Sequence, residues 1–412
     1  MPKIYPFRAT RPVRETISLV SSRNYESYDQ DEVESRLKYN PFSFLHILNP
    51  GFKYHKKLVG KDRFKPVKNR FEEFKEDEIL KKDKKASFYI HQIIYRDQQK
   101  FTGIIGTCHA DDYLADKIKK HEDTLQPRVE LFTEYLNTVR FNAEPVLISH
   151  KNDDKLQELI IRKMKERPEY EFATTSREAH YLWLVDDEKD LQQIQSCFEN
   201  MENLYIADGH HRIASSVNLA KKLKDETKNY TGKEDFNYIM SYFIPEDQLY
   251  IQEFNRLVKD LNGLDKEGFL IQLDEYFRIE NRGEDYYKPH RYHHFSMYLD
   301  GEFYSLYLRK NQLDQENALD EVDSHILYKF ILKPILGIDD LKNDERIKYI
   351  QGQKDMAYVK SSIDQGHFAV GFGMIPTPIE TIKHVADQSL CMPPKSTFID
   401  PKLRSGITVY EI

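Results

Sequence analysis

Apolar and polar positions along the chain show two kinds of pattern, one typical of strands and one typical of helices. The order of these patterns predicts a mixed α/β fold. Short runs rich in β-branched and aromatic residues read as strands. Residues 87–95 and 101–108 are two such runs, and the turn-prone residues 96–99 between them predict a hairpin. Charged segments such as 153–167 and 190–200 have apolar residues at helical spacing. Strands and helices therefore alternate in this half of the chain.

The same reading continues to the C-terminus. Further strands are expected at 41–48, 144–149, 179–185, 203–207, 238–244, 295–299, 304–308 and 368–374, and further helices at 266–276, 322–332 and 379–388. Asp300-Gly301 predicts a tight hairpin turn between two of these strands. We place a division near residue 260, giving a larger region at 1–260 and a smaller α/β region at 261–412, whose C-terminal block at 394–397 is expected to return to the site.

Several polar and ionisable residues lie together at one junction between a predicted strand and a predicted helix. The predicted strand at 203–207 leads into Asp208-Gly209-His210-His211-Arg212, and a helix follows. Gly209 allows a tight turn or a close approach of the backbone. A helix N-terminus offers free N–H groups, and an arginine adds a planar donor, so this junction suits a phosphate.

Two other interpretations of the junction stay open. Asp208 can simply cap the helix, with histidines that are packed or solvated. His210 and His211 can instead be ligands of a transition metal in a hydrolase, although the usual i, i+4 pair of histidines is absent from the sequence here.

Composition narrows the class of protein. The chain has 412 residues, with 61 basic and 68 acidic side chains and a net charge of −7, so no overall positive field favours nucleic acid. Three cysteines, Cys108, Cys197 and Cys391, lie far apart and form no metal-binding spacing. No window is apolar enough to span a bilayer. We expect a cytoplasmic protein that binds neither nucleic acid nor membranes; the sequence does not indicate its oligomeric state.

Two further stretches carry candidate chemistry. His121-Glu122 stands just ahead of a predicted helix, where an acidic residue is also favoured for structural reasons alone. Pro393-Pro394 stiffens the backbone ahead of Lys395, Ser396 and Thr397, whose amine, hydroxyls and N–H groups can hold a phosphate or a carboxylate. A rigid C-terminal turn is the alternative for this second stretch.

These three stretches carry a resemblance. Asp208 to Arg212 after an apolar strand resembles the signature of the free serine kinases, whose domain is related to ParB and sulfiredoxin. His121-Glu122 ahead of a helix, and then Glu144-Pro145, resembles the arrangement around the catalytic glutamate of those kinases. Pro394 to Thr397 is similar to a Pro-Lys-Thr-Thr block near their C-terminus, with Ser396 in place of a threonine. Over nearly its whole length the chain also resembles a large bacterial and archaeal family known only as a domain of unknown function.

The kinase resemblance implies a ParB/sulfiredoxin-like nucleotide-binding core with large insertions. It implies a kinase that moves the terminal phosphoryl group of ADP or ATP, with Mg²⁺, to a small hydroxylated substrate, most simply free L-serine. Glu122 would be the general base, Asp208 would orient Mg²⁺ or its water, and His210 would act at the phosphates. The other phosphate- and substrate-binding residues implied are Gly209, His211, Arg212, Lys395, Ser396 and Thr397.

Two departures from the resembled proteins affect this interpretation. The stretch between Glu122 and Asp208 is much longer than in the archaeal serine kinase, and Ser22-Arg23-Asn24-Tyr25 replaces a Pro-Pro-Tyr-Asp block of the broader family. The main alternative is a ParB-like switch that binds and slowly hydrolyses a nucleotide, although no basic DNA-reading helix pattern follows the junction. No cysteine neighbours Gly209 to Arg212, which argues against a sulfiredoxin-like repair activity.

Overall fold

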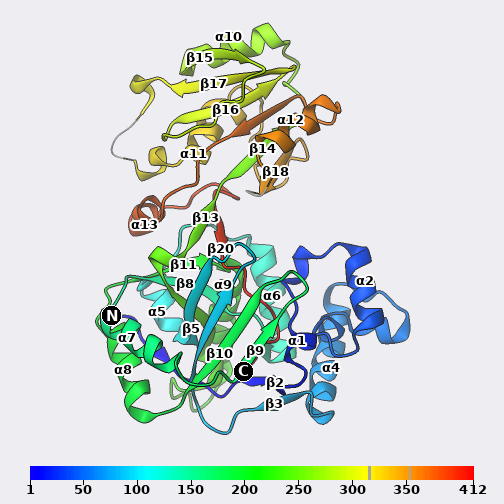
Figure 1. Cartoon of the computed structure of the whole chain (residues 1–412), viewed down its shortest axis with the longest axis vertical. Helices are drawn as coiled ribbons and strands as arrows, with labels where there is room; N and C mark the ends of the chain where they lie inside the picture. The colour runs from blue at the N-terminus through cyan, green and yellow to red at the C-terminus, as the bar shows by residue number, and fades with distance from the viewer. Residues whose placement is uncertain (314–316, 352–353) are drawn as a thin grey trace. The chain divides into compact units, whose positions relative to one another are not determined.

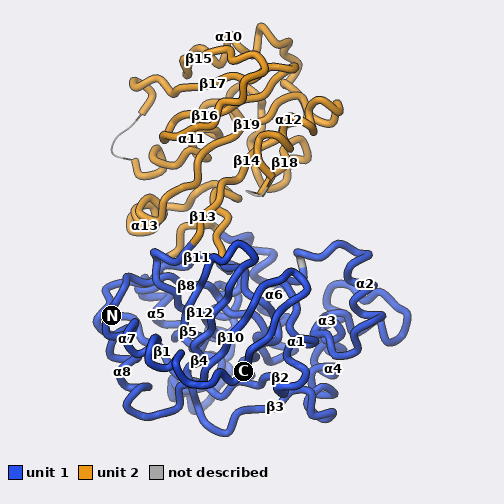
Figure 2. Tube along the Cα trace, viewed as in Figure 1, with its two compact units in different colours: residues 1–119, 124–249, 401–412 blue, residues 120–123, 250–400 orange. Residues whose placement is uncertain are grey.

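The computed structural model describes residues 1–313, 317–351 and 354–412. Its contacts divide the chain into two compact units: unit 1 is residues 1–119, 124–249 and 401–412, and unit 2 is residues 120–123 and 250–400 (Figure 2). The chain enters unit 2 near residue 250 rather than 260, because β13 (Tyr250–Gln252) already pairs with β20 (Phe398–Asp400) inside unit 2. A four-residue segment containing His121 and Glu122 also belongs to unit 2.

Unit 1 is built around a nine-stranded mixed sheet (Figure 1). In order across the sheet the strands are β6 (Ile118–Lys119), β11 (Leu204–Asp208), β8 (Val146–His150), β12 (Tyr238–Pro245), β5 (Lys100–His109), β4 (Phe88–Ile94), β10 (Ala179–Val185) and β9 (Tyr170–Ala173), with β1 (Ile4–Tyr5) also paired to β5. Two short pairs accompany this sheet: β2 (Thr10–Pro12) with β3 (Leu80–Lys82), and β7 (Phe141–Asn142) with β21 (Tyr410–Glu411). The predicted hairpin of β4 and β5 is confirmed.

The helices of unit 1 supply apolar faces to this sheet and to one another. They are α1 (Ile17–Val20), α2 (Gln30–Tyr39), α3 (Leu45–Leu48), α4 (Phe64–Glu76), α5 (Ala110–Leu114), α6 (Gln126–Val139), α7 (Asp154–Lys163), α8 (Glu188–Glu199) and α9 (His210–Glu226). Ile213, Val217 and Ala220 of α9 recur at helical spacing and join the strand residues in the main core. The fold is therefore mixed α/β, as expected.

The strand predicted at 41–48 is wrong. Residues Leu45–Leu48 form a single helical turn, and Phe44, Leu45 and Ile47 are fully buried. A short apolar run is compatible with a period of two as well as with one of 3.6, so its pattern cannot distinguish strand from helix.

Unit 2 contains an antiparallel six-stranded sheet with helices around it. The strands are β15 (Phe277–Gly283), β17 (Glu302–Leu308), β16 (His294–Leu299), β19 (Val370–Gly373), β14 (Phe254–Val258) and β18 (Ile347–Gln351), and the α-helices are α10 (Lys266–Tyr276), α11 (Asp323–Leu327), α12 (Met356–Asp364) and α13 (Ile379–Asp387). The predicted turn between β16 and β17 is confirmed, with positive φ at both Asp300 and Gly301. The helix predicted at 322–332 begins as α11 but continues as a π-helical turn, Tyr328–Leu332.

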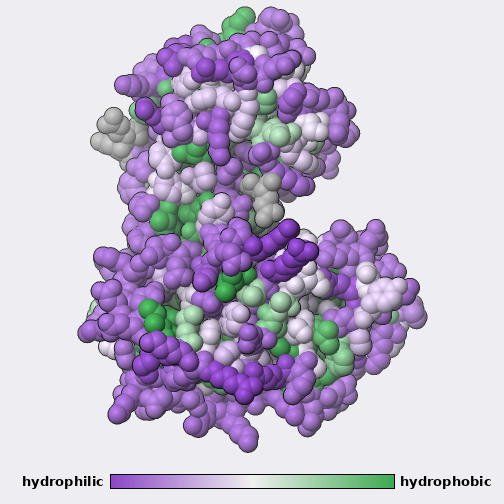
Figure 3. All heavy atoms as spheres, in the orientation of Figure 1, coloured by the Kyte–Doolittle hydropathy of each residue, from purple (hydrophilic) through white to green (hydrophobic). Residues whose placement is uncertain are grey.

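The visible surface is mainly hydrophilic. On the face shown in Figure 3, hydrophilic residues predominate over both units and hydrophobic ones occur in small groups. Among the helices formed by the described residues, none combines the length and apolar character needed to cross a bilayer.

A buried histidine at the end of β8 leads to a prediction for stability against pH. His150 is 2% exposed, and burial lowers its pKa to about 4, although its Nδ1 contacts the carbonyl of Lys151 at 2.8 Å. The unfolded pKa is about 6.5, so the stabilisation by neutral His150 is complete above that pH and is lost as the pH falls towards 4. Each pH unit in that window costs up to about 1.4 kcal/mol.

We therefore expect the stability advantage of the wild type over His150→Asn to shrink between pH 7.5 and pH 5. Denaturant unfolding followed by the fluorescence of Trp183, the single tryptophan and a residue of unit 1, measures it. An advantage that stays constant over this range would show that His150 does not titrate as described.

Candidate functional site

The junction at Gly209 has the predicted strand, turn and helix. β11 ends at Asp208, Gly209 has a φ of 97°, and α9 begins at His210. This backbone conformation is unfavourable for any residue with a side chain. A Cβ atom on Gly209 would also lie 2.8 Å from Nε of Arg212. Glycine therefore provides both the turn and the space that the guanidinium occupies.

A bulge in β11 sets the direction of Asp208. Ile206 pairs with Ile148 and Asp208 pairs with the next residue, Leu147, so Ala207 is an extra residue in the ladder. Such a bulge redirects the side chains that follow it. Ile206 is buried in the core, whereas Asp208 is only partly buried.

Asp208 lies between two cations. Its Oδ1 accepts from Nζ of Lys402 at 2.8 Å, and its Oδ2 accepts from Nη2 of Arg212 at 2.8 Å. Burial alone would raise the pKa of Asp208, but Lys402 and Arg212 hold it well below its usual range. The carboxylate is therefore ionised at any physiological pH.

A second carboxylate fixes the other side of Arg212. Nη1 of Arg212 donates to Oε1 of Glu144. Glu144 in turn accepts from Nδ2 of Asn24 at 2.9 Å and from Oγ of Ser405 at 3.2 Å. The guanidinium is thus held in one orientation by side chains from distant parts of the sequence.

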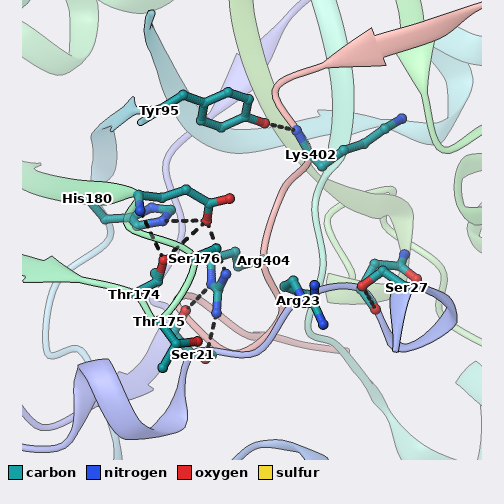
Figure 4. A network of polar contacts seen from close by, with 12 residues as sticks. Ser21, Arg23, Ser27, Tyr95, Thr174, Thr175, Ser176, His180, Lys402 and Arg404 are labelled. Atoms are coloured by element: carbon teal, nitrogen blue, oxygen red, sulfur yellow. Dashed lines mark hydrogen bonds and ion pairs between the residues drawn. The ribbon is translucent and has the colours of Figure 1, made fainter. Parts of the chain in front are cut away.

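The sequence analysis missed four residues of this site: Lys402, Glu144, Asn24 and Ser405. Lys402 and Ser405 lie just beyond the Pro-Lys-Ser-Thr block, and Asn24 lies in the N-terminal block that departs from the broader family. Figure 4 shows how the C-terminal segment is held: the backbone N–H of Lys402 donates to Oη of Tyr95 at 3.0 Å, and Nε of the buried Arg404 donates to Oγ of Ser21 at 2.9 Å. No short-range pattern announces these contacts.

The two histidines after Gly209 have different surroundings. His210 is 5% exposed. His211 contacts the start of α6, where the backbone N–H of Leu125 donates to its Nε2 at 3.1 Å. This bond places the proton of a neutral His211 ring on Nδ1. The contacts of both histidines with phosphate remain a prediction.

The second group of predicted residues lies in unit 2. His121 and Glu122 run beside Met392: the N–H of Met392 donates to the carbonyl of His121 at 2.8 Å, and Glu122 and Met392 form an isolated parallel bridge. The segment of His121 and Glu122 therefore lies directly beside the segment that leads from Met392 into Lys395, Ser396 and Thr397. The side chain of Glu122 is half-buried.

Within that block the three side chains differ. Lys395 is exposed and has a φ of 59°, and Thr397 is half-buried. The hydroxyl of buried Ser396 donates to the carbonyl of Pro393 at 2.6 Å and accepts from Oγ of Ser324, also at 2.6 Å. Ser396 shapes the turn, whereas Lys395 and Thr397 have the more accessible side chains.

The structure therefore gathers the predicted residues in two groups: Asp208 to Arg212 in unit 1, and Glu122 with the Lys395 to Thr397 block in unit 2. Across the described parts of the chain, no cluster of three or more His, Cys, Asp or Glu side chains is arranged to hold a metal ion.

Solved structures provide a comparison. The chain is similar to a free serine kinase mutant in complex with AMP, with 13% identity and a TM-score of 0.40, covering 73% of this chain and 90% of that chain. It is similar to a conserved hypothetical protein from Pyrococcus furiosus, with 12% identity and a TM-score of 0.37 over 74% and 94% of the two chains. C-terminally truncated SbnI from Staphylococcus aureus matches with 13% identity and a TM-score of 0.38 over 72% and 82%.

Comparison of the sequence with curated proteins finds no match. A family model does match, and it covers residues 4–325, which include the Asp208 to Arg212 junction, Glu122 and Glu144. The chain belongs to the family described as protein of unknown function DUF1015.

Proposed function

We propose that this protein is a phosphotransferase that moves the terminal phosphoryl group of ADP or ATP to the hydroxyl of a small molecule, with free L-serine as the expected acceptor. The observation that carries the proposal is the junction at Gly209. A glycine with positive φ immediately precedes a 17-residue helix, and the side chains of Arg212 and Lys402 meet at Asp208 beside it. The free N–H groups and positive end of such a helix suit nucleotide phosphates.

Arg212 has free N–H donors with which it can bind phosphate. A guanidinium has five N–H donors, and the described contacts with Asp208 and Glu144 use two of them. The remaining donors can reach phosphate oxygens while the carboxylates hold the plane of the group in place.

The residues present are compatible with Mg²⁺. In phosphoryl-transfer sites this ion is held by one or two carboxylates together with phosphate oxygens and water. Asp208 would be the protein ligand, since its carboxylate stays ionised. When bound, the ion neutralises charge that develops on the phosphates.

The other residues receive roles that follow from the resemblance. Glu122 accepts the proton of the acceptor hydroxyl. Lys395 and Thr397 bind the phosphoryl group or the acceptor. The resemblance implies the same for Ser396, but its hydroxyl is bonded to Pro393 and Ser324, and we assign it the maintenance of the turn instead. His210 and His211 complete the contacts with phosphate.

Arg212→Ala provides the first test. Loss of a charge-assisted contact should weaken nucleotide binding by about 1.5–3 kcal/mol. Calorimetric titration of the folded variant with ADP and ATP measures this. Arg162→Ala is the matched control, because Arg162 forms a similar pair with Asp190 at 2.6 Å elsewhere in unit 1. Equal nucleotide affinity in the wild type and Arg212→Ala would remove Arg212 from the phosphate site.

A further inference from the structure

Arg256 in β14 is a buried cation without a counterion. The residue is 2% exposed, and none of the described carboxylates forms a salt bridge with it. Its surroundings are neutral: Nη1 donates to the carbonyl of Phe254 at 2.6 Å, Nη2 donates to the carbonyl of Lys395 at 2.8 Å, and the ring of Tyr349 lies 4.5 Å from its Cζ. Burial lowers the pKa of Arg256 to about 10, so it remains a cation at neutral pH.

These contacts leave most N–H donors of the Arg256 guanidinium without an acceptor among the described residues. Two carbonyls accept from two of its five N–H groups, and within the described structure no further acceptor is recorded. A buried charge that is not neutralised is costly, and a residue that only clamped two carbonyls could be replaced by a neutral donor without that cost. An anion bound to Arg256 would offset the cost.

The location of Arg256 connects it with the acceptor chemistry. Its bond to Lys395 ties it to the segment that runs from Met392 to Thr397, and that segment lies beside His121 and Glu122 in the same unit. An anion held at Arg256 therefore lies near the residues assigned to the acceptor.

We propose that Arg256 binds the carboxylate of the acceptor, so that the substrate is a small hydroxy acid rather than a simple alcohol. This inference rests on the proposed function. A carboxylate is favoured over a phosphate because one buried cation balances one negative charge, whereas a phosphate dianion would leave an excess charge in the same buried place. The planar fork of the guanidinium also matches the two oxygens of a carboxylate.

The test is calorimetric binding of L-serine, glycolate, serinol and inorganic phosphate to the wild type. We expect L-serine or glycolate to bind, and serinol, which has the hydroxyls but no carboxylate, to bind at least about 10-fold more weakly. Arg256→Met should weaken binding of the carboxylates by about 10- to 150-fold and leave ADP affinity unchanged, with Arg256→Lys in between.

Arg346→Met is the matched control, because Arg346 also donates to two backbone carbonyls of unit 2, those of Leu336 and Gly337, but is paired with Asp344. Its effect on carboxylate binding should be absent. Unfolding of each variant is followed in parallel, and if Arg256→Met does not fold, the lysine variant and the wild-type series decide.

The inference is overturned if serinol binds as tightly as L-serine, if no carboxylate binds, if phosphate binds more tightly than the carboxylates and Arg256→Met weakens that phosphate binding, or if folded Arg256→Met keeps its affinity for carboxylates. Carboxylate binding that depends on Arg256, without any phosphorylation of hydroxy acids by the wild type, would instead contradict the proposed function and leave this site in place.

Discussion

Replacing Glu122 with glutamine is expected to lower phosphoryl transfer by about 10²–10⁴-fold while nucleotide affinity stays nearly unchanged. An alcohol attacks a phosphoryl group effectively only when a base accepts its proton. Glutamine keeps the shape of the side chain and its place beside Met392, but it cannot accept that proton. The effect should therefore appear in turnover and not in binding.

Asp123→Asn is the matched control, because it removes a neighbouring carboxylate from an exposed position in the same segment. Product formation and nucleotide titration are measured for both variants and for the wild type. Full activity in Glu122→Gln would show that another residue is the base.

Gly209→Ala is expected to abolish measurable nucleotide binding, a loss of at least about 10²-fold. The methyl group would lie 2.8 Å from Nε of Arg212, so the guanidinium must leave its place between Asp208 and Glu144. The backbone, with a φ of 97°, would be strained as well, at a cost of about 1–3 kcal/mol. Both effects disturb the junction at Gly209, where we propose that the phosphates bind.

Gly232→Ala separates the two effects. Gly232 also belongs to unit 1 and has a φ of 81°, but a Cβ atom there would meet nothing within 4 Å. Similar losses of stability in the two variants, with loss of nucleotide binding only in Gly209→Ala, are expected from titration and denaturant unfolding. If the two variants bind nucleotide equally well, Gly209 is a turn residue without a role in binding.

Local patterns were sufficient to predict the junction and both hairpins. The strand before Asp208, the turn at Gly209 and the helix after it are each encoded by neighbouring residues, and the same holds for Asp300-Gly301. Each of these elements is decided within about ten residues, by hydrophobic period and turn chemistry.

Contacts between distant residues could not be predicted in this way. Lys402 reaches Asp208, and Asn24 reaches Glu144, across separations of 194 and 120 residues. Arg256 looks in the sequence like any arginine in a strand, and only its burial against Lys395 and Tyr349 distinguishes it. The helical turn at Leu45–Leu48 was missed because it is too short for its apolar pattern to distinguish helix from strand.

The proposed transfer reaction is tested most directly by incubating the purified protein with L-serine, Mg²⁺ and either ADP or ATP and identifying the products by mass spectrometry. The account predicts O-phosphoserine, or the phosphorylated form of a related hydroxy acid, formed in equal amounts with AMP from ADP or with ADP from ATP. Nucleotide hydrolysis that yields only inorganic phosphate and is indifferent to every hydroxy acid would contradict it and favour a nucleotide-binding switch.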